Sequence, residues 1–395
     1  MNPALPDMSM RIRSAAASKT TRIFELALDL SRKGRDIISL SVGEPDFATP
    51  QPIIQATSKA LEDQATRYGP VAGLPALRQQ LAKHQSSNME DSTKDAHAED
   101  ICTADNILVT NGAKQALYSL FQILCDPGSE IIVPIPCWVS FSEQIKLAGG
   151  IPVLVPTPNH QLNPDAIEKA ISPMTRAILV NSPNNPTGAV YDAESLGRIA
   201  RLAEEHNLYL ISDEAYQQIF YGDSPPVAMA GLVTTKERVI TVGSFSKHYN
   251  MTGFRIGYVV AHKKIIQSLI KLQGHTTGNV CTFAQHGALA ALAMDQSIVV
   301  THRASLARRR DLAFGCVSEL FPCVNAQGAF YLFADVSQHL GPDETSEDFS
   351  LMLLERAGVA VVPGEAFHGP GHVRISFAIN EDRLQEAFDR IRAVL

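Results

Sequence analysis

The sequence has no excess of basic residues and no long apolar run. It contains 34 lysines and arginines against 41 aspartates and glutamates, a formal net charge of −7. Nucleic-acid-binding proteins usually carry a basic excess, so this balance argues against nucleic-acid binding. Apolar stretches such as 288–294 fall far short of the roughly 20 residues that a membrane-spanning helix needs. We therefore expect neither a nucleic acid nor a membrane as a partner.

The cysteines and histidines also lack the spacings that are typical of redox or metal-binding motifs. The six cysteines include no Cys-x-x-Cys pair, which is typical of thiols in a reducing compartment. The twelve histidines show no metal-ligand spacing, so we expect no metal. The first residues carry no apolar core of a secretory signal. These features predict a cytoplasmic protein.

Several nucleotide-binding and hydrolase motifs are missing as well. There is no Gly-Lys dipeptide, which excludes a Walker A loop. No Gly-x-Gly-x-x-Gly follows a strand, which weakens a dinucleotide interpretation. Neither His-Glu-x-x-His nor Gly-x-Ser-x-Gly occurs, so the usual zinc-protease and serine-hydrolase signatures are absent.

What the sequence does contain is a regular alternation of strand-length apolar runs and helical patterns. The runs are continuously apolar, which is typical of strands buried on both faces. The expected strands are NILVTN (106–111), EIIVP (130–134), IPVLV (151–155), RAILVN (176–181), LYLISD (208–213), RVITVG (238–243) and RIGYVV (255–260). Helical patterns lie between many of them, for example at 163–171 and 192–206. This repetition predicts an α/β fold with a mostly parallel central sheet covered by helices.

The pattern changes near residue 297, which predicts three regions. Residues 1–50 would form an N-terminal arm and part of a small domain, 51–297 a large domain, and 298–395 a C-terminal small α+β domain. The helices expected outside the large domain are 22–33, 297–321, 346–357 and one starting at the cap Asn380; the strands are 37–43, 329–336, 359–364 and 372–378. Residues 1–50 are too few for a core of their own, so we expect them to pack on the C-terminal domain.

Two charged segments are expected to face solvent. The segment 88–100 is polar and acidic and has no period, so we predict a surface loop. The run Arg308-Arg309-Arg310 lies within the predicted helix 297–321 and would form a solvated helix face.

Polar residues follow the buried strands at the positions where ligands bind. In open α/β sheets, ligands lie beyond the carboxyl ends of the strands. The residues there are 111–114, Asn185, Asp213 with Tyr216, 244–247 and Arg255. A carboxylate such as Asp213 at the end of a buried strand is costly without a cation. Lys247, in an apolar and glycine-rich setting, can lose its proton near neutral pH and attack a carbonyl. The sequence thus predicts a site with a nucleophilic amine, an anion pocket and a buried acid.

At this point the sequence resembles a known family. SFSKHYNMTGFRIGY is similar to the lysine signature of the class I/II pyridoxal-phosphate aminotransferases of fold type I. The remaining motifs of this family occur in order: SVGEPDF, RYGPVAGLPALR, TNGAKQAL, PCWVSF, NSPNNPTG, SDEAY and GHVRISFA. The resemblance spans nearly the whole chain and is strongest toward bacterial aspartate aminotransferases of the Iβ type.

The resemblance implies pyridoxal 5'-phosphate as the cofactor, bound by the large domain, and catalytic roles for Lys247, Asp213 and Tyr216. Lys247 would hold the cofactor covalently, and Asp213 would pair with its pyridine nitrogen. The other implied cofactor contacts are Asn185 and Tyr216 to the phenolic oxygen, Trp138 stacked on the ring, and Ser244, Arg255 and the backbone amides of Gly112, Ala113 and Lys114 around the phosphate. Tyr68 would reach the phosphate of a neighbouring subunit, which implies a homodimer with shared active sites.

The resemblance also implies how the substrates, an amino acid and a 2-oxo acid, would bind. Arg374 would take the α-carboxylate as a bidentate pair, and the backbone of Gly43 would contact it. Trp138 and Asn185 would also face the substrate, and Lys114 would meet the distal carboxylate of a dicarboxylic acid. The activity that follows is ping-pong transfer of an amino group between L-aspartate and 2-oxoglutarate.

Other functions stay open at this stage. An aromatic, alanine or prephenate-type aminotransferase would share these motifs, and a pyridoxal-phosphate lyase would share the lysine and the arginine. Aminotransferase-like transcription regulators carry a DNA-binding segment, for which we expect the 40 residues before SVGEPDF to leave no room. The sequence departs from the family at His248 and Tyr249, where a small residue or phenylalanine is common, and the role of His248 is open.

Overall fold

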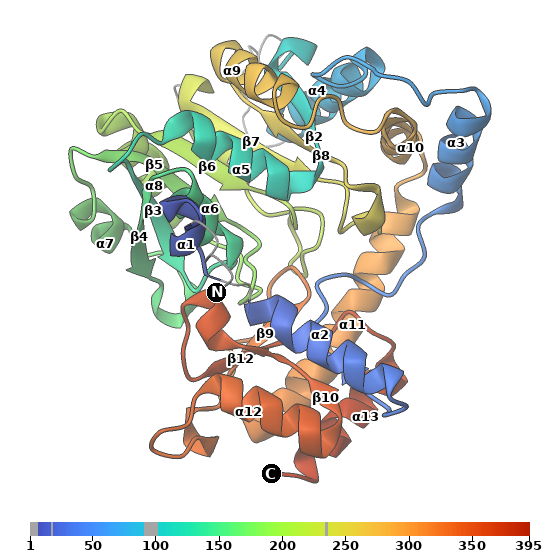
Figure 1. The fold of residues 1–395 in the computed structure, drawn as a ribbon, viewed down its shortest axis with the longest axis vertical. Coiled ribbons are helices and arrows are strands. Elements are labelled where there is room, and N and C mark those ends of the chain that lie inside the picture. The colour runs from blue at the N-terminus through green and yellow to red at the C-terminus, as the bar shows by residue number, and fades with distance from the viewer. Residues whose placement is uncertain (1–6, 17–18, 91–101, 234–235) are drawn as a thin grey trace, which may run out of the picture.

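The computed structural model describes residues 7–16, 19–90, 102–233 and 236–395. A seven-stranded sheet forms the upper part of the molecule in Figure 1. Its strands, in spatial order, are β2 (Ile107–Thr110), β8 (Gly257–Val260), β7 (Val239–Ser244), β6 (Tyr209–Asp213), β5 (Thr175–Asn181), β3 (Glu130–Ile135) and β4 (Ile151–Pro156). All neighbouring pairs run parallel except those of β8, which is antiparallel to β2 and β7. The predicted α/β class with a mostly parallel sheet is confirmed.

The direction of β8 follows from the chain that precedes it. Parallel neighbours need a long crossover, usually a helix, whereas antiparallel neighbours need only a short connection. Only residues 245–256 join β7 to β8, so β8 returns beside β7. Gly257 therefore stands opposite both Ser244 and Thr110, which brings the ends of β2 and β7 and the start of β8 to one edge.

Helices cover both faces of this sheet. Apolar side chains of α5 (Gly112–Leu124), α6 (Ser140–Leu147) and α9 (Lys263–Gly274) pack against it in one core cluster. Those of α8 (Ala193–Glu205) and α7 (Pro164–Lys169) form a second cluster, and those of α3 (Gln51–Glu62), α4 (Pro75–Glu90) and α10 (Thr282–Ala293) form a third over β2 and β8. Within the described part of the chain, every helix is too short or too polar to cross a membrane.

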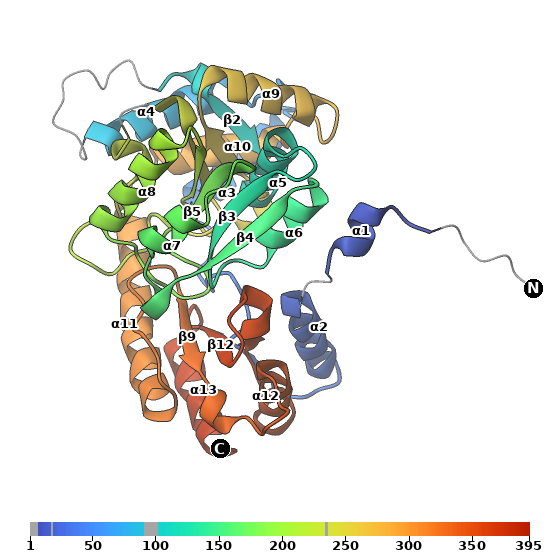
Figure 2. The ribbon, with the colours of Figure 1, turned by 90° about the vertical axis from the view of Figure 1, so that its left-hand side faces the viewer.

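A smaller assembly of helices and strands lies below the sheet (Figures 1 and 2). Its three-stranded antiparallel sheet has the order β11 (Val362–Pro363), β12 (His372–Ser376) and β9 (Tyr331–Asp335). The helices α2 (Lys19–Arg32), α11 (Ser297–Leu320), α12 (Ser346–Met352) and α13 (Glu381–Arg392) surround it, and the five-residue helix α1 (Met10–Ser14) lies off to one side beside α6 (Figure 2).

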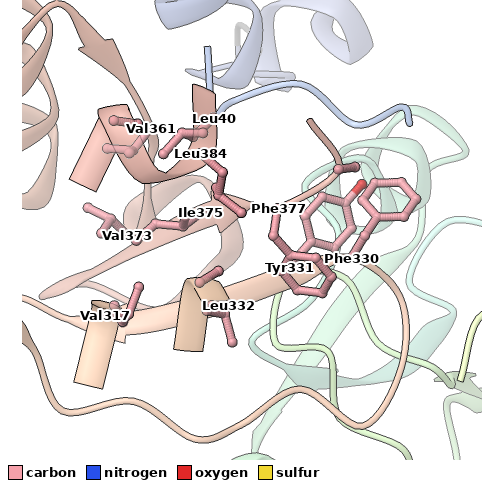
Figure 3. Packing of buried hydrophobic residues seen from close by; sticks show 14 of the residues in the cluster. Leu40, Val317, Phe330, Tyr331, Leu332, Val361, Val373, Ile375, Phe377 and Leu384 are labelled. Carbon is pink, nitrogen blue, oxygen red and sulfur yellow. The ribbon is translucent and has the colours of Figure 1, made fainter. Parts of the chain in front are cut away.

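The N-terminal arm packs on this smaller part, as expected. Strand β1 (Ile38–Ser39) pairs in parallel with β10 (Val359–Ala360). Leu40 is fully buried beside Val361 and Leu384 in the cluster that Figure 3 shows. The boundaries at 50/51 and 297/298 stay predictions.

The structure corrects several element boundaries. The predicted strand 359–364 is two strands, β10 and β11, which pair in different sheets on either side of Val361. Its apolar residues are all buried, so the pattern gave no sign of the break. The predicted strand 37–43 is only Ile38–Ser39, and residues 41–43 line the cavity described below. Residues 88–90 of the predicted loop 88–100 belong to α4, which continues to Glu90. Residues 91–100 lie outside the described residues.

The prediction of a solvated face for Arg308-Arg309-Arg310 is wrong for Arg309. Its side chain is 9% exposed and forms an ion pair with Asp46, Nη1 to Oδ1, at 2.6 Å. Arg308 is exposed, and Arg310 lies 4.7 Å from the centre of the Tyr221 ring. Consecutive residues of a helix point in different directions, so three adjacent arginines cannot all face solvent on the same side.

Candidate active site

A cavity of about 420 Å³ lies at the carboxyl ends of β5, β6 and β7, as the sequence predicted for the ligand site. Its wall is completed by the start of α5, by residues 41–44 and by β12. Of the residues singled out from the sequence, those that line it are Gly43, Ala113, Lys114, Trp138, Asn185, Asp213, Tyr216, Ser244, Lys247, Arg255 and Arg374. The fold thus gathers residues from positions up to 331 residues apart, from Gly43 to Arg374.

Lys247 follows β7 and points its amine across the cavity. Its Nζ donates a hydrogen bond of 2.6 Å to the carbonyl of Gly43 and lies 6.0 Å from the centre of the Tyr216 ring. Burial lowers the pKa of Lys247 to about 8; the nearby positive charges of Arg255, Arg374 and Lys114 add to this, and Glu44 opposes it. A buried amine with this pKa is partly neutral near physiological pH, the state in which it is nucleophilic.

Asp213 ends β6 and places its carboxyl group at the floor of the cavity. One oxygen accepts a hydrogen bond of 3.1 Å from the backbone amide of Ala215. Burial raises the pKa of Asp213 to about 7, although the Ala215 amide and the charge of Lys247 both favour the ionised form. Asp213 forms no ion pair with any of the described residues, so its ionised form would be stabilised by a cationic ligand.

The start of α5 forms a cradle for an anion together with Arg255. Asn111 precedes the helix and gives no side-chain cap, so the first amides of α5 are left for another acceptor. A Cβ atom at Gly112 would lie 2.8 Å from Nη2 of Arg255, and one at Gly257 would lie 2.6 Å from the backbone nitrogen of Ala113. Gly112 therefore permits the close approach of the Arg255 guanidinium, and Gly257 permits the close approach of β8 to the backbone at the start of α5. A helix start favours negative charge.

Arg374 lies on β12 and is 5% exposed. Its Nη1 donates to Oδ1 of Asn185 at 3.1 Å and its Nη2 to the carbonyl of Ser41 at 2.7 Å, while its Nε is buried without a partner. Among the described residues Arg374 has no carboxylate partner. A buried guanidinium held only by neutral acceptors is suited to a carboxylate ligand, which it binds with two parallel hydrogen bonds.

Two aromatic groups complete the wall. Trp138 lines the cavity, and Nζ of Lys114 lies 5.1 Å from the centre of its ring. The hydroxyl of Tyr216 is hydrogen-bonded to that of Tyr331 at 3.0 Å, and burial raises the pKa of Tyr216 well above its ordinary value. Tyr216 therefore keeps its proton and can donate it to an acceptor in the cavity.

The cavity carries more positive than negative groups. Its cations are Lys114, Lys247, Arg255 and Arg374, and its carboxylates are Asp213 and Glu44. This balance suits a ligand, or a pair of ligands, with several negative charges.

Comparison with known proteins decides the family. The model of the family "Aminotransferase class I and II" matches residues 35–391. The chain belongs to the class I and II aminotransferases. The aspartate aminotransferase of Geobacillus stearothermophilus is 38% identical over 392 residues, which cover 97% of this chain and 98% of that protein. The aspartate/prephenate aminotransferase of Thermus thermophilus is 40% identical over 397 residues, 98% of each chain.

Solved structures agree with this assignment. The structure of the aspartate aminotransferase from Thermus thermophilus with maleate superposes with a TM-score of 0.91 at 38% identity, over 99% of this chain and 100% of that one. The aspartate aminotransferase of Thermotoga maritima gives a TM-score of 0.90 at 38% identity, over 98% and 99%. The fold is therefore fold type I, and the resemblance noted from the sequence motifs is confirmed.

Two of the residues named from the sequence do not line the cavity of this aminotransferase. Gly112 stands behind Arg255 and acts through its lack of a side chain. Tyr68 is fully exposed in the single chain, and the assigned role needs a second subunit.

The sequence reasoning missed other residues of the cavity. Asn181 binds Asp213 and Asn185 at once: its Nδ2 donates to the Asp213 carbonyl at 3.1 Å, and its Oδ1 accepts from the Asn185 amide at 3.0 Å. It is the last residue of the run RAILVN, so its position at a strand end was a usable signal. Tyr331 sits inside the apolar run 329–336 and reads as core, and Ser41 contributes only its carbonyl, which no side-chain motif reveals.

Proposed function

We propose that this aminotransferase uses pyridoxal 5'-phosphate to move an amino group between L-aspartate and 2-oxoglutarate by a ping-pong mechanism. The observation that carries the proposal is the arrangement of three groups around one cavity. An amine (Lys247), a buried carboxyl group (Asp213) and an anion cradle (the start of α5 with Arg255) correspond to the aldehyde, the ring nitrogen and the phosphate of this cofactor. The residues present therefore fit the group.

When bound, pyridoxal phosphate supplies an electron sink for the bond that is broken at the substrate's α-carbon. The residues of the chain do the rest. Lys247 would hold the cofactor and then move the proton at the α-carbon. Asp213 would keep a proton on the ring nitrogen, since a neighbouring carboxylate raises the pKa of a cation by roughly 1–3 units. Asn185 and Tyr216 would hydrogen-bond the ring oxygen, Trp138 would cover the ring, and Ser244 and Arg255 would hold the phosphate.

The preference for a dicarboxylic substrate rests on two cations of the cavity. Arg374 has no carboxylate partner among the described residues and would bind the α-carboxylate, with the backbone of Gly43 beside it. Burying a second carboxylate unpaired is costly, so a dicarboxylic acid needs another cation. Lys114 lines the same cavity next to Trp138. Relatives with 38–40% identity are named as aspartate or aspartate/prephenate aminotransferases, which supports the same substrate class.

The substrate assignment is tested by single-turnover bleaching of the cofactor-loaded enzyme with a panel of amino acids. We expect aspartate and glutamate to react fastest. A faster reaction with phenylalanine or alanine would overturn the aspartate assignment and leave the aminotransferase activity intact. Prephenate is tested as an acceptor, because the Thermus thermophilus relative is named an aspartate/prephenate aminotransferase and Trp138 provides an aromatic wall in the cavity. Release of a side-chain fragment without amino transfer would favour a lyase.

Replacing Lys114 by alanine should separate dicarboxylic from other substrates. If Lys114 binds the distal carboxylate, kcat/KM for aspartate and glutamate should fall by roughly 2–5 kcal/mol of transition-state binding, the usual loss when one partner of a buried charge pair is removed. Values for alanine and phenylalanine should stay nearly constant. Lys146→Ala is the control, since Lys146 pairs with Glu143 on α6 and does not line the cavity. An equal fall for every substrate, with weaker cofactor binding, would mean that Lys114 serves only the phosphate.

We also propose a cytoplasmic homodimer with shared sites. All six cysteines are free thiols, which suits a reducing compartment. Tyr68 is a fully exposed aromatic residue in the single chain. In a dimer, Tyr68 of one subunit would contact the phosphate site of the other subunit.

Mixing Lys247→Ala chains with Tyr68→Phe chains tests this sharing. If each site takes Lys247 from one chain and Tyr68 from the other, a hybrid dimer has one site with both lesions and one intact site. Its activity at limiting cofactor should then exceed that of either parent. Activity at the mean of the two parents, or full activity of a monomer by sedimentation, would contradict shared sites.

A further inference from the structure

Residues 41–43 hold both of the cations on which the proposed reaction depends. The Ser41 carbonyl accepts from Nη2 of Arg374 at 2.7 Å, and the Gly43 carbonyl accepts from Nζ of Lys247 at 2.6 Å. Both acceptors are backbone atoms, so their positions are set by the path of the segment and not by its side chains. Whatever fixes that path also fixes the guanidinium and the amine.

The segment continues to Phe47 and is fixed there by α11. The Asp46 carboxylate forms an ion pair of 2.6 Å with Nη1 of Arg309, whose side chain is only 9% exposed. The Asp46 amide donates to the carbonyl of Ala378 at 3.1 Å, which connects Asp46 to the chain two residues after β12. Between Gly43 and Asp46, the Glu44 carboxylate accepts from the hydroxyl of Thr252 at 2.6 Å.

Phe47 adds a second contact to the same helix. Its ring stacks flat on the ring of His302, with centres 4.3 Å apart and 2° between planes. The guanidinium carbon of Arg309 lies 4.6 Å from the centre of the Phe47 ring. His302 in turn lies 3.1 Å from Asn250, from its Nδ1 to the amide nitrogen, and Asn250 is three residues after Lys247. Arg309 and His302 lie about two turns apart on α11. Through them, α11 contacts both the segment 41–47 and the connection between β7 and β8 that carries Lys247.

We propose that Arg309 and Phe47 are positioning residues for the transamination reaction. Through the Asp46 pair and the stacked ring, they fix the segment whose carbonyls orient Arg374 toward the substrate carboxylate and Lys247 toward the reacting carbon. The inference rests on the proposed roles of Lys247 and Arg374. It explains why an arginine is buried on α11: its planar guanidinium serves a carboxylate and an aromatic face at once, which a lysine ammonium does not.

Arg309→Met tests the proposal, because methionine retains an apolar chain and loses both the ion pair and the planar group. Arg310→Met is the matched control: Arg310 is the next residue on α11 and makes the same kind of contact, to Tyr221, away from the cavity. Binding of maleate is followed by the fluorescence of Trp138, the only tryptophan and a residue of the cavity wall. Turnover with aspartate and thermal unfolding are measured in parallel.

We expect Arg309→Met to weaken maleate binding and raise KM by roughly 10-fold or more, because small displacements of orienting groups have large effects. Arg310→Met should leave both values within about 3-fold of the unmutated enzyme, a spread too small for a lost orienting contact. Arg309→Lys should restore only part of the loss. Phe47→Leu should also weaken maleate binding and raise KM. The double variant should be little worse than either single one, because both residues fix the same segment and their effects are not independent.

Several outcomes would overturn the proposal. Equal changes in maleate binding for Arg309→Met and Arg310→Met would show a general effect of α11, and so would a fall in unfolding temperature with unchanged maleate affinity. If Arg309→Met does not fold, unaltered maleate binding in Phe47→Leu is sufficient to reject the proposal. Failure of the proposed function is seen separately, as absence of aspartate turnover in the unmutated enzyme.

Discussion

Replacing Lys247 by alanine should remove nearly all transamination activity. A positioned proton-transfer group alone contributes roughly 10²–10⁴-fold to a rate, and this variant loses the covalent hold on the cofactor as well. We therefore expect a fall of at least roughly 10³-fold in the half-reaction with aspartate. Lys271→Ala, at an exposed position of α9, should retain full activity.

Borohydride reduction locates the attachment directly. In the unmutated enzyme the reduced cofactor should be found on the peptide that contains Lys247, and in Lys247→Ala no peptide should carry it. Label on another lysine would contradict the assignment.

The lowered pKa of Lys247 gives this prediction a pH dependence. Only the neutral amine attacks a carbonyl, and the pKa of Lys247 is lowered to about 8 by burial. Loading of the cofactor-free enzyme should therefore accelerate as the pH rises, with a midpoint near the pKa of about 8. A loading rate that is constant over this range would mean that another group is rate-determining.

The second large effect is expected from Asp213→Asn. Asparagine has nearly the same shape, but it removes the negative charge that would keep the ring nitrogen protonated. Loss of one preorganised electrostatic group costs about 10²–10³-fold in rate, and we expect the half-reaction to slow by at least this factor while the cofactor still binds. Absorbance of the bound cofactor and rapid-mixing kinetics report the two effects separately.

The neighbouring residue provides a matched control. Glu214 is also a buried carboxyl group with a pKa raised to about 7, but it accepts a hydrogen bond from Ser212 and does not line the cavity. Glu214→Gln removes a charge one residue away and should leave the rate within a few-fold of normal. Near-normal turnover in Asp213→Asn, or an equal loss in Glu214→Gln, would rule out a special role for Asp213.

Much of the sheet and of the site could be predicted because both depend on local patterns. Buried parallel strands read as apolar runs, and their polar ends meet at one edge, which is why Asp213, Ser244 and Asn185 were found together. The reversed direction of β8 required knowing that residues 245–256 contain no α-helix and only a short 3-10 turn at Thr252–Phe254. The strands β10 and β11 form one apolar run in the sequence, so only the paired partners separate them.

The contacts that could not be predicted from the sequence involve backbone atoms or residues far apart in the chain. The Ser41 carbonyl, which accepts from Arg374, carries no residue-specific signal. Gly43 was predicted only as a backbone contact of the substrate, and its carbonyl also accepts from Lys247. Arg309 looks like its two neighbours until Asp46, 263 residues earlier, is placed beside it. Tyr331 lies within an apolar run of the sequence and so looks like a core residue, but in the structure its hydroxyl is hydrogen-bonded to that of Tyr216.

The short connection between β7 and β8 carries both Lys247 and Arg255, whereas Arg374 belongs to the smaller sheet and Gly43 to the arm that packs on it. The groups proposed to hold the cofactor are thus built on a different part of the fold from Arg374 and Gly43, which are proposed to hold the substrate's α-carboxylate. A ping-pong enzyme must let its first product leave while it retains the altered cofactor for the second half of the cycle. Two separate supports allow this, since a small separation between them would release the acid and leave the cofactor seated.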